Sequence, residues 1–324
     1  MNVFLRDGDA VYRAWHTDGR GTEQLTHTFA LVDLLPYGRQ EEWQDSPRRL
    51  AAVARLQPMA LRQGHRRPLR AGSAGLAISV HVRGKGMTDD LQPMPDDWTR
   101  ALAVVAHPDD MEFGSAGAVA AWTGAGKQVG YLLLTRGEAG IDSMPPEQAR
   151  KVREEEQHAS AAVVGVSSVE FLDHPDGAIE RSPRLRHDLV AALRRHRPEL
   201  VVTFNHHDFT FTGKWNSPDH RVTGRAVLDA VLDAGNRWIL PDAGAEPWGG
   251  VRYVAIAGSV RPTHAVDVTG YLDAALASVE AHAAYLAALG VPPGGARAPL
   301  EGFVNAAGQR FGGRPAVPFE LIAC

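Results

Sequence analysis

Cysteine is almost absent from this sequence of 324 residues, where Cys324 is the only one. A single thiol excludes a disulfide within the chain, and it also excludes a metal site built from several thiolates. A metal site in one chain must therefore use histidine nitrogens and carboxylate oxygens. A cytoplasmic protein is the expectation, since disulfide-rich folds belong to oxidising compartments.

Long hydrophobic runs are also missing. No apolar stretch approaches the roughly 20 residues that a transmembrane helix needs. The first residues, Met1–Asp7, lack the apolar core of a secretion signal. The formal net charge of −4 is that of an ordinary globular protein, so no membrane partner is expected.

Acidic residues disappear between Ser46 and Thr88, while arginines crowd the first half of this stretch. One interpretation is a nucleic-acid-binding arm at residues 48–70. Such an arm would use aromatic side chains to stack on bases, and the stretch has none. A disordered linker over residues 46–97 is therefore favoured, and nucleic acid is not the expected partner. A third interpretation is that the natural chain starts at Met87.

The segment before this stretch has strand-like features. Residues 2–16 predict a β-hairpin because two apolar triplets flank the turn-forming Asp7-Gly8 pair. A further apolar element is expected at residues 29–35. Through Phe4–Asp9, Gly19–Gly21 and Val32–Trp43, residues 1–45 resemble the C-terminal end of a thioredoxin-like family of unknown function. The segment is too short for the whole of such a fold, so a partial domain is expected.

Apolar runs alternate with helical patterns from Trp98 onward. This alternation predicts a Rossmann-like, three-layer α/β/α fold with a mostly parallel sheet and right-handed crossovers, over residues 98–324. The predicted strands are 101–106, 129–134, 168–172, 200–204, 251–257 and 265–268. The predicted helices are 114–126, 146–164, 183–196, 220–234 and one long amphipathic helix at 269–289. The Gly- and Pro-rich tail beyond Gly290 is expected to be irregular.

Residues capable of chemistry follow the first of these strands. The apolar run 101–106 ends at His107-Pro108-Asp109-Asp110, where the proline cannot donate to a sheet. A second cluster, Trp215–His220, opens a predicted helix. His107, Asp110 and His220 would supply two nitrogens and one oxygen, as in a catalytic zinc site with an open position. Asp109 would then be free to act as a general base. Spacing alone leaves open that these side chains are structural or solvated.

Three motifs occur in a fixed order: Ala106–Asp110, Thr135–Gly140 and Pro218–His220. Together they resemble the zinc-dependent N-acetylglucosaminyl de-N-acetylase family, the PIG-L/LmbE-like deacetylases, over residues 99–285. The resemblance implies a Zn²⁺ ion held by His107, Asp110 and His220, with Asp109 as catalytic base. Iron, cobalt or nickel could occupy the same set of ligands.

Further residues are assigned from the same resemblance. Arg136 is expected to contact the substrate, because a guanidinium suits sugar hydroxyls or a phosphate; a salt bridge to Glu138 or Glu112 is the alternative. Asp219 is expected to orient a histidine, or else to cap a helix. Glu112 is expected to support the ligands without binding the metal. Asp176 could touch the substrate or simply form a turn.

One position departs from the family pattern. Many members carry a histidine where this chain has Ser217, and that histidine is thought to stabilise the tetrahedral intermediate or to protonate the leaving amine. A serine can donate a hydrogen bond but cannot be a cation at neutral pH. His206 or His207 could substitute for it, and His264 and His282 are further candidates.

The resulting hypothesis is a metal-dependent hydrolase of an N-acetylated amino sugar or glycoconjugate. In this hypothesis Asp109 takes a proton from a metal-activated water as the water attacks the acetamide, and acetate and a free amine leave. The alternatives are a mycothiol-conjugate-type amidase and a non-catalytic module that binds a metal or a sugar. An oligomer is possible.

Overall fold

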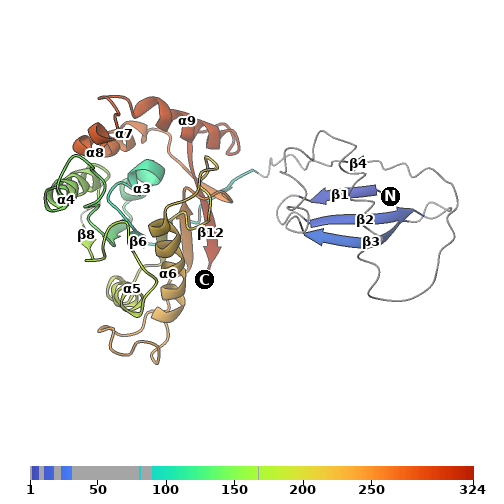
Figure 1. The fold of residues 1–324 in the computed structure, drawn as a ribbon, viewed down its shortest axis with the longest axis horizontal. Helices are drawn as coiled ribbons and strands as arrows, with labels where there is room; N and C mark the ends of the chain where they lie inside the picture. The colour runs from blue at the N-terminus through green and yellow to red at the C-terminus, as the bar shows by residue number, and fades with distance from the viewer. Residues whose placement is uncertain (1, 7–10, 18–22, 31–79, 82–89, 167) are drawn as a thin grey trace. The chain divides into compact units, whose positions relative to one another are not determined.

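The computed structural model describes residues 2–6, 11–17, 23–30, 80–81, 90–166 and 168–324 (Figure 1). The chain divides into two compact units, Met1–Asp89 and Asp90–Cys324. Among the described residues, no helix combines the length and the apolar character needed to cross a bilayer.

The first unit contains a four-stranded sheet in the order β3-β2-β1-β4. The predicted hairpin is confirmed, because β1 pairs with β2 in the antiparallel sense. β3 begins earlier than the apolar element expected at 29–35, most of which lies outside the described residues. The proposed basic arm at 48–70 and the possible start at Met87 also lie outside them. The strands are β1 (Asn2–Arg6), β2 (Val11–Thr17), β3 (Glu23–Ala30) and β4 (Val80–His81).

The second unit is built on an eight-stranded sheet in the order β5-β11-β12-β10-β9-β6-β7-β8. β12 is antiparallel to both of its neighbours, and the other pairings are parallel, so the sheet is mostly parallel as predicted. The strands are β5 (Gln92–Pro93), β6 (Arg100–Val105), β7 (Gln128–Leu133), β8 (Ser168–Phe171), β9 (Leu200–Phe204), β10 (Tyr253–Ala257), β11 (His264–Asp267) and β12 (Ala316–Ala323).

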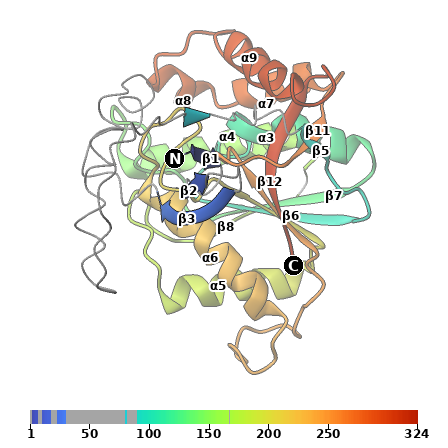
Figure 2. The same ribbon diagram turned by 90° about the vertical axis from the view of Figure 1, so that its right-hand side faces the viewer.

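Helices cover both faces of this sheet, which gives the expected three layers. In both views α3, α4, α7, α8 and α9 lie on one face, and α5 and α6 lie on the other (Figures 1 and 2). Alternate residues of β6 show why: Ala103 and Val105 enter the first core, while Leu102 and Val104 enter the second. The helices are α3 (Glu112–Gly124), α4 (Pro146–Val163), α5 (Pro183–His196), α6 (Pro218–Ala234), α7 (Leu272–Glu280), α8 (Ala283–Ala288) and α9 (Arg297–Gly308).

The prediction of one long helix at 269–289 is wrong. The chain leaves the helical conformation at His282, whose ψ angle is +49°, and so α7 and α8 are separate helices. The break buries His282 and brings Tyr285 of α8 against Arg153 of α4, at 3.8 Å from the guanidinium carbon to the ring centre. Tertiary packing has overridden a continuous helical pattern.

The prediction of an irregular tail beyond Gly290 is also wrong. α9 packs Leu300, Phe303 and Val304 against the first core, and β12 is inserted between β10 and β11. Glycine and proline are concentrated in the connections on either side of α9. The overall composition of the tail therefore masked an amphipathic helix and a strand.

Residues 90–97, which the sequence analysis places in the linker over 46–97, are part of the second compact unit. The second compact unit begins at Asp90, and β5 pairs with β11. Leu91 and Trp98 are both buried. These apolar side chains pack into the core of the second unit, which the composition of the basic stretch before them does not reveal.

The topology places several loops at one edge of the sheet. β6 is flanked by β7 on one side and by β9 on the other, so the chain changes direction along the sheet at β6. Sites in open α/β sheets form at such a point, outside the carboxyl ends of the strands. The loops after β6 and β9 both begin there, and they lead to His107 and His220.

Candidate metal centre

The loop after β6 is held by its own carboxylate. The Oδ2 atom of Asp110 accepts hydrogen bonds from the backbone N–H groups of Ala106, at 3.1 Å, and His107, at 2.9 Å. The Asp110 side chain is buried. Its second oxygen is left to face His220, so the local hydrogen bonding of the loop determines where that oxygen points.

His220 lies in the first turn of α6 and is oriented by the loop that precedes the helix. Its Nδ1–H donates to the side-chain oxygen of Asn216, at 3.2 Å. Asn216 is buried and in turn donates to the carbonyls of Asn205 and His207. The Nε2 atom of His220 therefore remains available as a ligand.

The three ligands expected from the sequence converge. His220 Nε2 lies 2.9 Å from Asp110 Oδ1 and 3.3 Å from His107 Nδ1. His107 Nδ1 lies 3.7 Å from Asp110 Oδ2. One ligand atom from each residue lies within 4.8 Å of the others, as a single divalent cation would require.

The second nitrogen of His107 faces away from this group. Its Nε2 atom lies 3.1 Å from a carboxylate oxygen of Asp219 and 3.1 Å from one of Asp176. The Asp219 oxygens also accept from the backbone N–H groups of Gly177 and Ile179, which fixes the loop after β8 against α6. A carboxylate on the far nitrogen orients a metal-binding imidazole and increases its basicity.

The pKa values of His107 and Asp110 are shifted strongly by their charged neighbours. Burial alone would lower the pKa of His107, but hydrogen bonds to Asp110, Asp176 and Asp219 raise it well above its ordinary value. Burial alone would raise the pKa of Asp110, but the His220 and His107 imidazoles hold it well below its ordinary range. His107 and the surrounding carboxylates therefore stabilise one another's charged forms.

Asp109 differs from its neighbours in its backbone conformation and in the pKa of its carboxyl. It has a φ angle of +86°, which is rare for a residue with a side chain, and strain of this kind concentrates at functional sites. Burial raises the pKa of its carboxyl to about 7, although the Arg153 guanidinium opposes this shift. A carboxylate with a pKa near neutrality is suited to accept and return a proton.

Arg153 is the buried partner of Asp109. Its side chain is only 2% exposed, its Nη2 atom lies 3.2 Å from Asp109 Oδ2, and it donates to the carbonyl of Pro108 at 2.6 Å. A Cβ at Gly137 or Gly140 would collide with its guanidinium. The two glycines of the Thr135–Gly140 motif therefore make room for the arginine beside Asp109.

A second buried network supports the backbone of Asp109. Its N–H donates to Gln157 Oε1 at 3.0 Å, and Gln157 donates to Glu112 at 2.9 Å. Ser160 also donates to Glu112, whose second oxygen lies 3.7 Å from His282. Glu112 thus supports the backbone of Asp109 through Gln157.

Arg136 follows β7 and is already paired. Its guanidinium lies 2.8 Å from Glu154 and 2.5 Å from Asp173. The alternative expectation, a salt bridge from Arg136 to Glu138 or Glu112, is wrong, because the guanidinium pairs with Glu154 and Asp173. Glu138 accepts only from the backbone N–H of Arg136. Arg136 still lines a small polar pocket of about 240 Å³ with Glu138, Arg150, Asp173, His174 and Pro175.

The remaining predicted residues serve visible structural roles. Ser217 caps α6, since its Oγ accepts from the N–H of Asp219 at 3.2 Å. Asp176 accepts from the N–H of Ala139 in addition to its contact with His107. His206 packs on His207, with ring centres 4.5 Å apart, and burial lowers its pKa. His207 bonds to Glu320 at 2.7 Å, and His264 bonds to Thr263.

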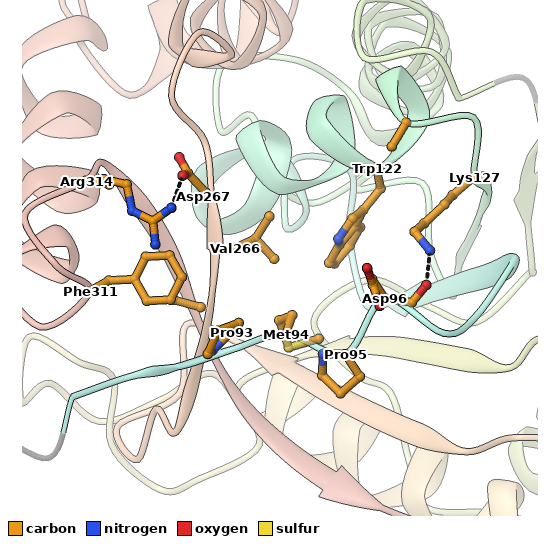
Figure 3. A pocket seen from close by; sticks show the side chains of 12 residues that line it. Pro93, Met94, Pro95, Asp96, Trp122, Lys127, Val266, Asp267, Phe311 and Arg314 are labelled. Carbon is orange, nitrogen blue, oxygen red and sulfur yellow. Dashed lines mark hydrogen bonds and ion pairs between the residues drawn. The ribbon is translucent and has the colours of Figure 1, made fainter.

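A larger pocket lies away from these residues. It has a volume of about 370 Å³, and Met94, Trp122, Val266 and Phe311 form apolar walls (Figure 3). Three of its four charged side chains are already engaged: Arg314 pairs with Asp267, and Lys127 donates to backbone carbonyls. This pocket is the larger of the two, but it is not the better candidate for an active site, because the candidate metal ligands and Asp109 do not line it.

Sequence reasoning missed Arg153, Gln157, Asn216 and Tyr285. A usable signal for the first two was present in α4, where Ala149, Arg153, Gln157 and Ser160 form the buried stripe of a helix that is otherwise highly charged. Polar residues at core-facing positions of a helix need buried partners. No comparable signal marks Asn216, whose role depends on how the loop closes.

Comparison with known families agrees with this geometry. Residues 102–231, which include His107, Asp109, Asp110 and His220, match the model of the GlcNAc-PI de-N-acetylase (PIG-L) family. This part of the chain is similar to the PIG-L family. A separate match, over residues 1–58, is to a bacterial protein family of unknown function (DUF899).

Several curated relatives of this part of the chain are named as deacetylases. A diacetylchitobiose deacetylase of Thermococcus kodakarensis is 29% identical over 197 residues, which are 58% of this chain and 70% of the relative. A probable N-acetyl-alpha-D-glucosaminyl L-malate deacetylase of Bacillus anthracis is 30% identical over 137 residues. That match covers 40% of this chain and 58% of the relative, which is less than two thirds of its length.

Solved structures share the fold of the second compact unit. An N,N'-diacetylchitobiose deacetylase from Pyrococcus horikoshii superposes with a TM-score of 0.63 at 23% identity. The superposition covers 70% of this chain and 84% of that one. The common architecture is thus the α/β/α arrangement that brings the loops after β6 and β9 together.

Proposed function

We propose that this protein is a metal-dependent hydrolase that removes an acetyl group from an N-acetylated amino sugar or glycoconjugate. The observation that carries the proposal is the convergence of His107, Asp110 and His220 beside the buried carboxyl of Asp109. The deacetylase relatives support the same reaction class. A cytoplasmic location is part of the proposal.

The donor set fits a divalent metal. Two imidazole nitrogens and one carboxylate oxygen converge, and the second nitrogen of each imidazole already has an acceptor, Asp219 for His107 and Asn216 for His220. This set suits zinc, although other first-row metals accept the same ligands. A bound divalent ion would supply Lewis acidity, which polarises an amide carbonyl and makes water more acidic.

Asp109 is the residue that we assign to proton transfer. Its carboxylate takes a proton from the attacking water, and the water oxygen forms the new bond to the acetamide carbon. The C–N bond then breaks, and the proton goes to the departing amine, so that acetate and a free amine are released. Arg153 holds the Asp109 carboxylate in place through its contact at 3.2 Å.

The donor to the amine is also proposed to be Asp109. Ser217, which departs from the histidine of the family pattern described above, is engaged as the cap of α6. Burial gives Asp109 a pKa of about 7, which allows one carboxyl to accept the proton and then to return it.

Metal analysis together with acetate release tests the proposal. The full chain is stripped of metal, reloaded with Zn²⁺, Fe²⁺, Co²⁺ or Ni²⁺, and assayed on a panel of N-acetylated sugars. We expect one equivalent of metal per chain and metal-dependent release of acetate, with both lost in His107→Ala. Acetate release by the metal-free protein, or full activity of His107→Ala, would contradict the proposal.

A further inference from the structure

The candidate metal centre has no assigned hydrogen-bond donor for the oxygen of the attacked acetamide. Ser217 replaces the residue expected to supply one, and its Oγ caps α6. His207 is bonded to Glu320, and His282 is only 1% exposed, so neither is free to meet a substrate. A bound metal shares the charge that develops on this oxygen, and a fixed donor beside the metal would stabilise that charge further.

Tyr285 of α8 carries a hydroxyl that the fold does not use. The residue is half-buried, and among the residues that the structure describes no group bonds to its hydroxyl oxygen. Solvent reaches that oxygen, whereas the hydroxyl of Tyr131 is buried without a partner. An accessible phenol without a partner in the fold is free to donate a hydrogen bond to a ligand.

The ring of Tyr285 is held next to the residue assigned to proton transfer. Its centre lies 3.8 Å from the guanidinium carbon of Arg153, and Arg153 Nη2 lies 3.2 Å from Asp109 Oδ2. The N–H of Ala284 donates to Glu156 at 2.5 Å, which ties α8 to the helix that carries Arg153. Only the guanidinium of Arg153 therefore separates the phenol ring from the Asp109 carboxylate.

Electrostatic effects agree with a hydroxyl close to the metal centre. Burial raises the pKa of Tyr285 to about 12. The carboxylates of Asp109 and Asp110 add to this rise, and the positive charge of His107 opposes it. Individual charges shift a pKa mainly over short distances, so these groups lie near the hydroxyl. A phenol with a pKa of about 12 stays protonated at neutral pH, and it therefore acts as a hydrogen-bond donor and not as a base.

We propose that the Tyr285 hydroxyl donates a hydrogen bond to the carbonyl oxygen of the acetamide, a bond that strengthens as this oxygen becomes negative. The inference rests on the proposed function and adds a catalytic residue to it. No proton is transferred at Tyr285, because the proton of the attacking water passes through Asp109 to the amine. A phenol from α8 thus takes the role expected of the histidine that Ser217 replaces.

The first test measures acetate release by metal-loaded Tyr285→Phe, which loses the hydroxyl and keeps the ring over Arg153. On an N-acetylated sugar that the wild-type enzyme hydrolyses, kcat should fall by about 10- to 100-fold, a moderate loss because the metal shares the charge. KM should change little, since the bond is strongest in the transition state. Metal content should stay at the wild-type level. An unchanged kcat would overturn the inference.

Binding of a tetrahedral analogue gives a readout that does not depend on turnover. The probe is the methylphosphonamidate of glucosamine, in which a tetrahedral phosphorus with an anionic oxygen replaces the acetamide carbon. Glucosamine, the amine product, is the comparison ligand. Calorimetry should show that Tyr285→Phe binds the analogue about 10- to 100-fold more weakly and binds glucosamine equally well. Equal weakening of both ligands would make Tyr285 only a structural cover of Arg153 and would overturn the inference.

Tyr271→Phe is the matched control. Tyr271 immediately precedes α7, and its hydroxyl lies close to Gly124 at the end of α3. Removal of this hydroxyl should leave kcat and both binding constants unchanged. A loss as large as that in Tyr285→Phe would mean that the effect is not specific to the phenol beside Arg153, and it would also overturn the inference.

Failure of the proposed function is distinguishable from failure of this inference. If the metal-loaded wild-type protein releases no acetate from any N-acetylated sugar, it is titrated with acetohydroxamate, a small metal ligand with the same acetyl carbonyl. Weaker binding of acetohydroxamate by Tyr285→Phe than by the wild type and Tyr271→Phe would support the hydroxyl as a donor at the metal centre. Equal binding by all three proteins, or no binding by the wild type, would overturn the inference.

Discussion

The two segments that supply the three candidate metal ligands are built differently. The loop after β6 is buried, and the carboxylate of Asp110 holds its own backbone in place. The loop after β9 is a longer excursion whose outer part is exposed, and the buried amide of Asn216 ties its end to His220.

The first segment holds Asp109 in a strained conformation beside Arg153, which is the rigidity that proton transfer needs. The second segment brings one ligand to the same point and carries the exposed rings of Phe209, Phe211 and Trp215. Loss of the Asp109 carboxylate in the first should therefore abolish turnover, while loss of the hydrogen bond that orients His220 in the second should mainly weaken metal binding.

The largest effect is expected for Asp109→Asn in the first segment. The amide keeps the shape of the side chain but cannot accept a proton, so kcat should fall by about 10²- to 10⁴-fold. Metal content, measured in the same samples, should stay at the wild-type level. If the Asp109→Asn enzyme remains fully active, another group must be the base.

Asp219→Asn tests whether His107 depends on its far-side carboxylate. Loss of this charge-assisted hydrogen bond should weaken metal binding by about 10- to 100-fold. The dissociation constant is measured by competition with a chelator, and circular dichroism checks the fold because Asp219 also bonds to two backbone N–H groups. Unchanged affinity in a folded variant would assign the orienting role to Asp176 alone.

Lower pH should weaken metal binding through His107. The pKa of this imidazole is raised by its carboxylate neighbours although burial opposes the shift, so its protonated form persists to higher pH than in a free imidazole. A ligand must be neutral to bind, so affinity falls as pH falls, by about tenfold per unit for each proton displaced. Asp110 stays ionised because its pKa is depressed. Affinity that is constant between about pH 8 and pH 6 would contradict this account.

The smallest effect is expected for Asn216→Ala in the second segment. His220 would lose one neutral hydrogen bond, which should weaken metal binding by roughly threefold to tenfold. Chelator competition measures this change, and Asn236→Ala, in the loop after α6, serves as an amide control. A loss as large as that of Asp219→Asn would mean that the two segments constrain their ligands equally.

Local patterns predicted most of the sheet and its helices. β6, β7, β8 and β9 lie within one residue of their predicted bounds, because an apolar run between polar breaks is a local property. The C-terminal quarter was less predictable. The break at His282 and the insertion of β12 between β10 and β11 depend on partners that are distant in sequence.

The amino-acid sequence by itself determined the α/β order and the identity of His107, Asp109, Asp110 and His220, because each lies in a short motif next to a strand or helix end. Only the tertiary structure decided which groups hold them: Arg153 beside Asp109, Asp219 behind His107 and Asn216 behind His220. Hydrogen bonds and ion pairs depend on distances of a few ångströms between segments that are far apart in the chain. Those distances exist only after the sheet and its covering helices have packed.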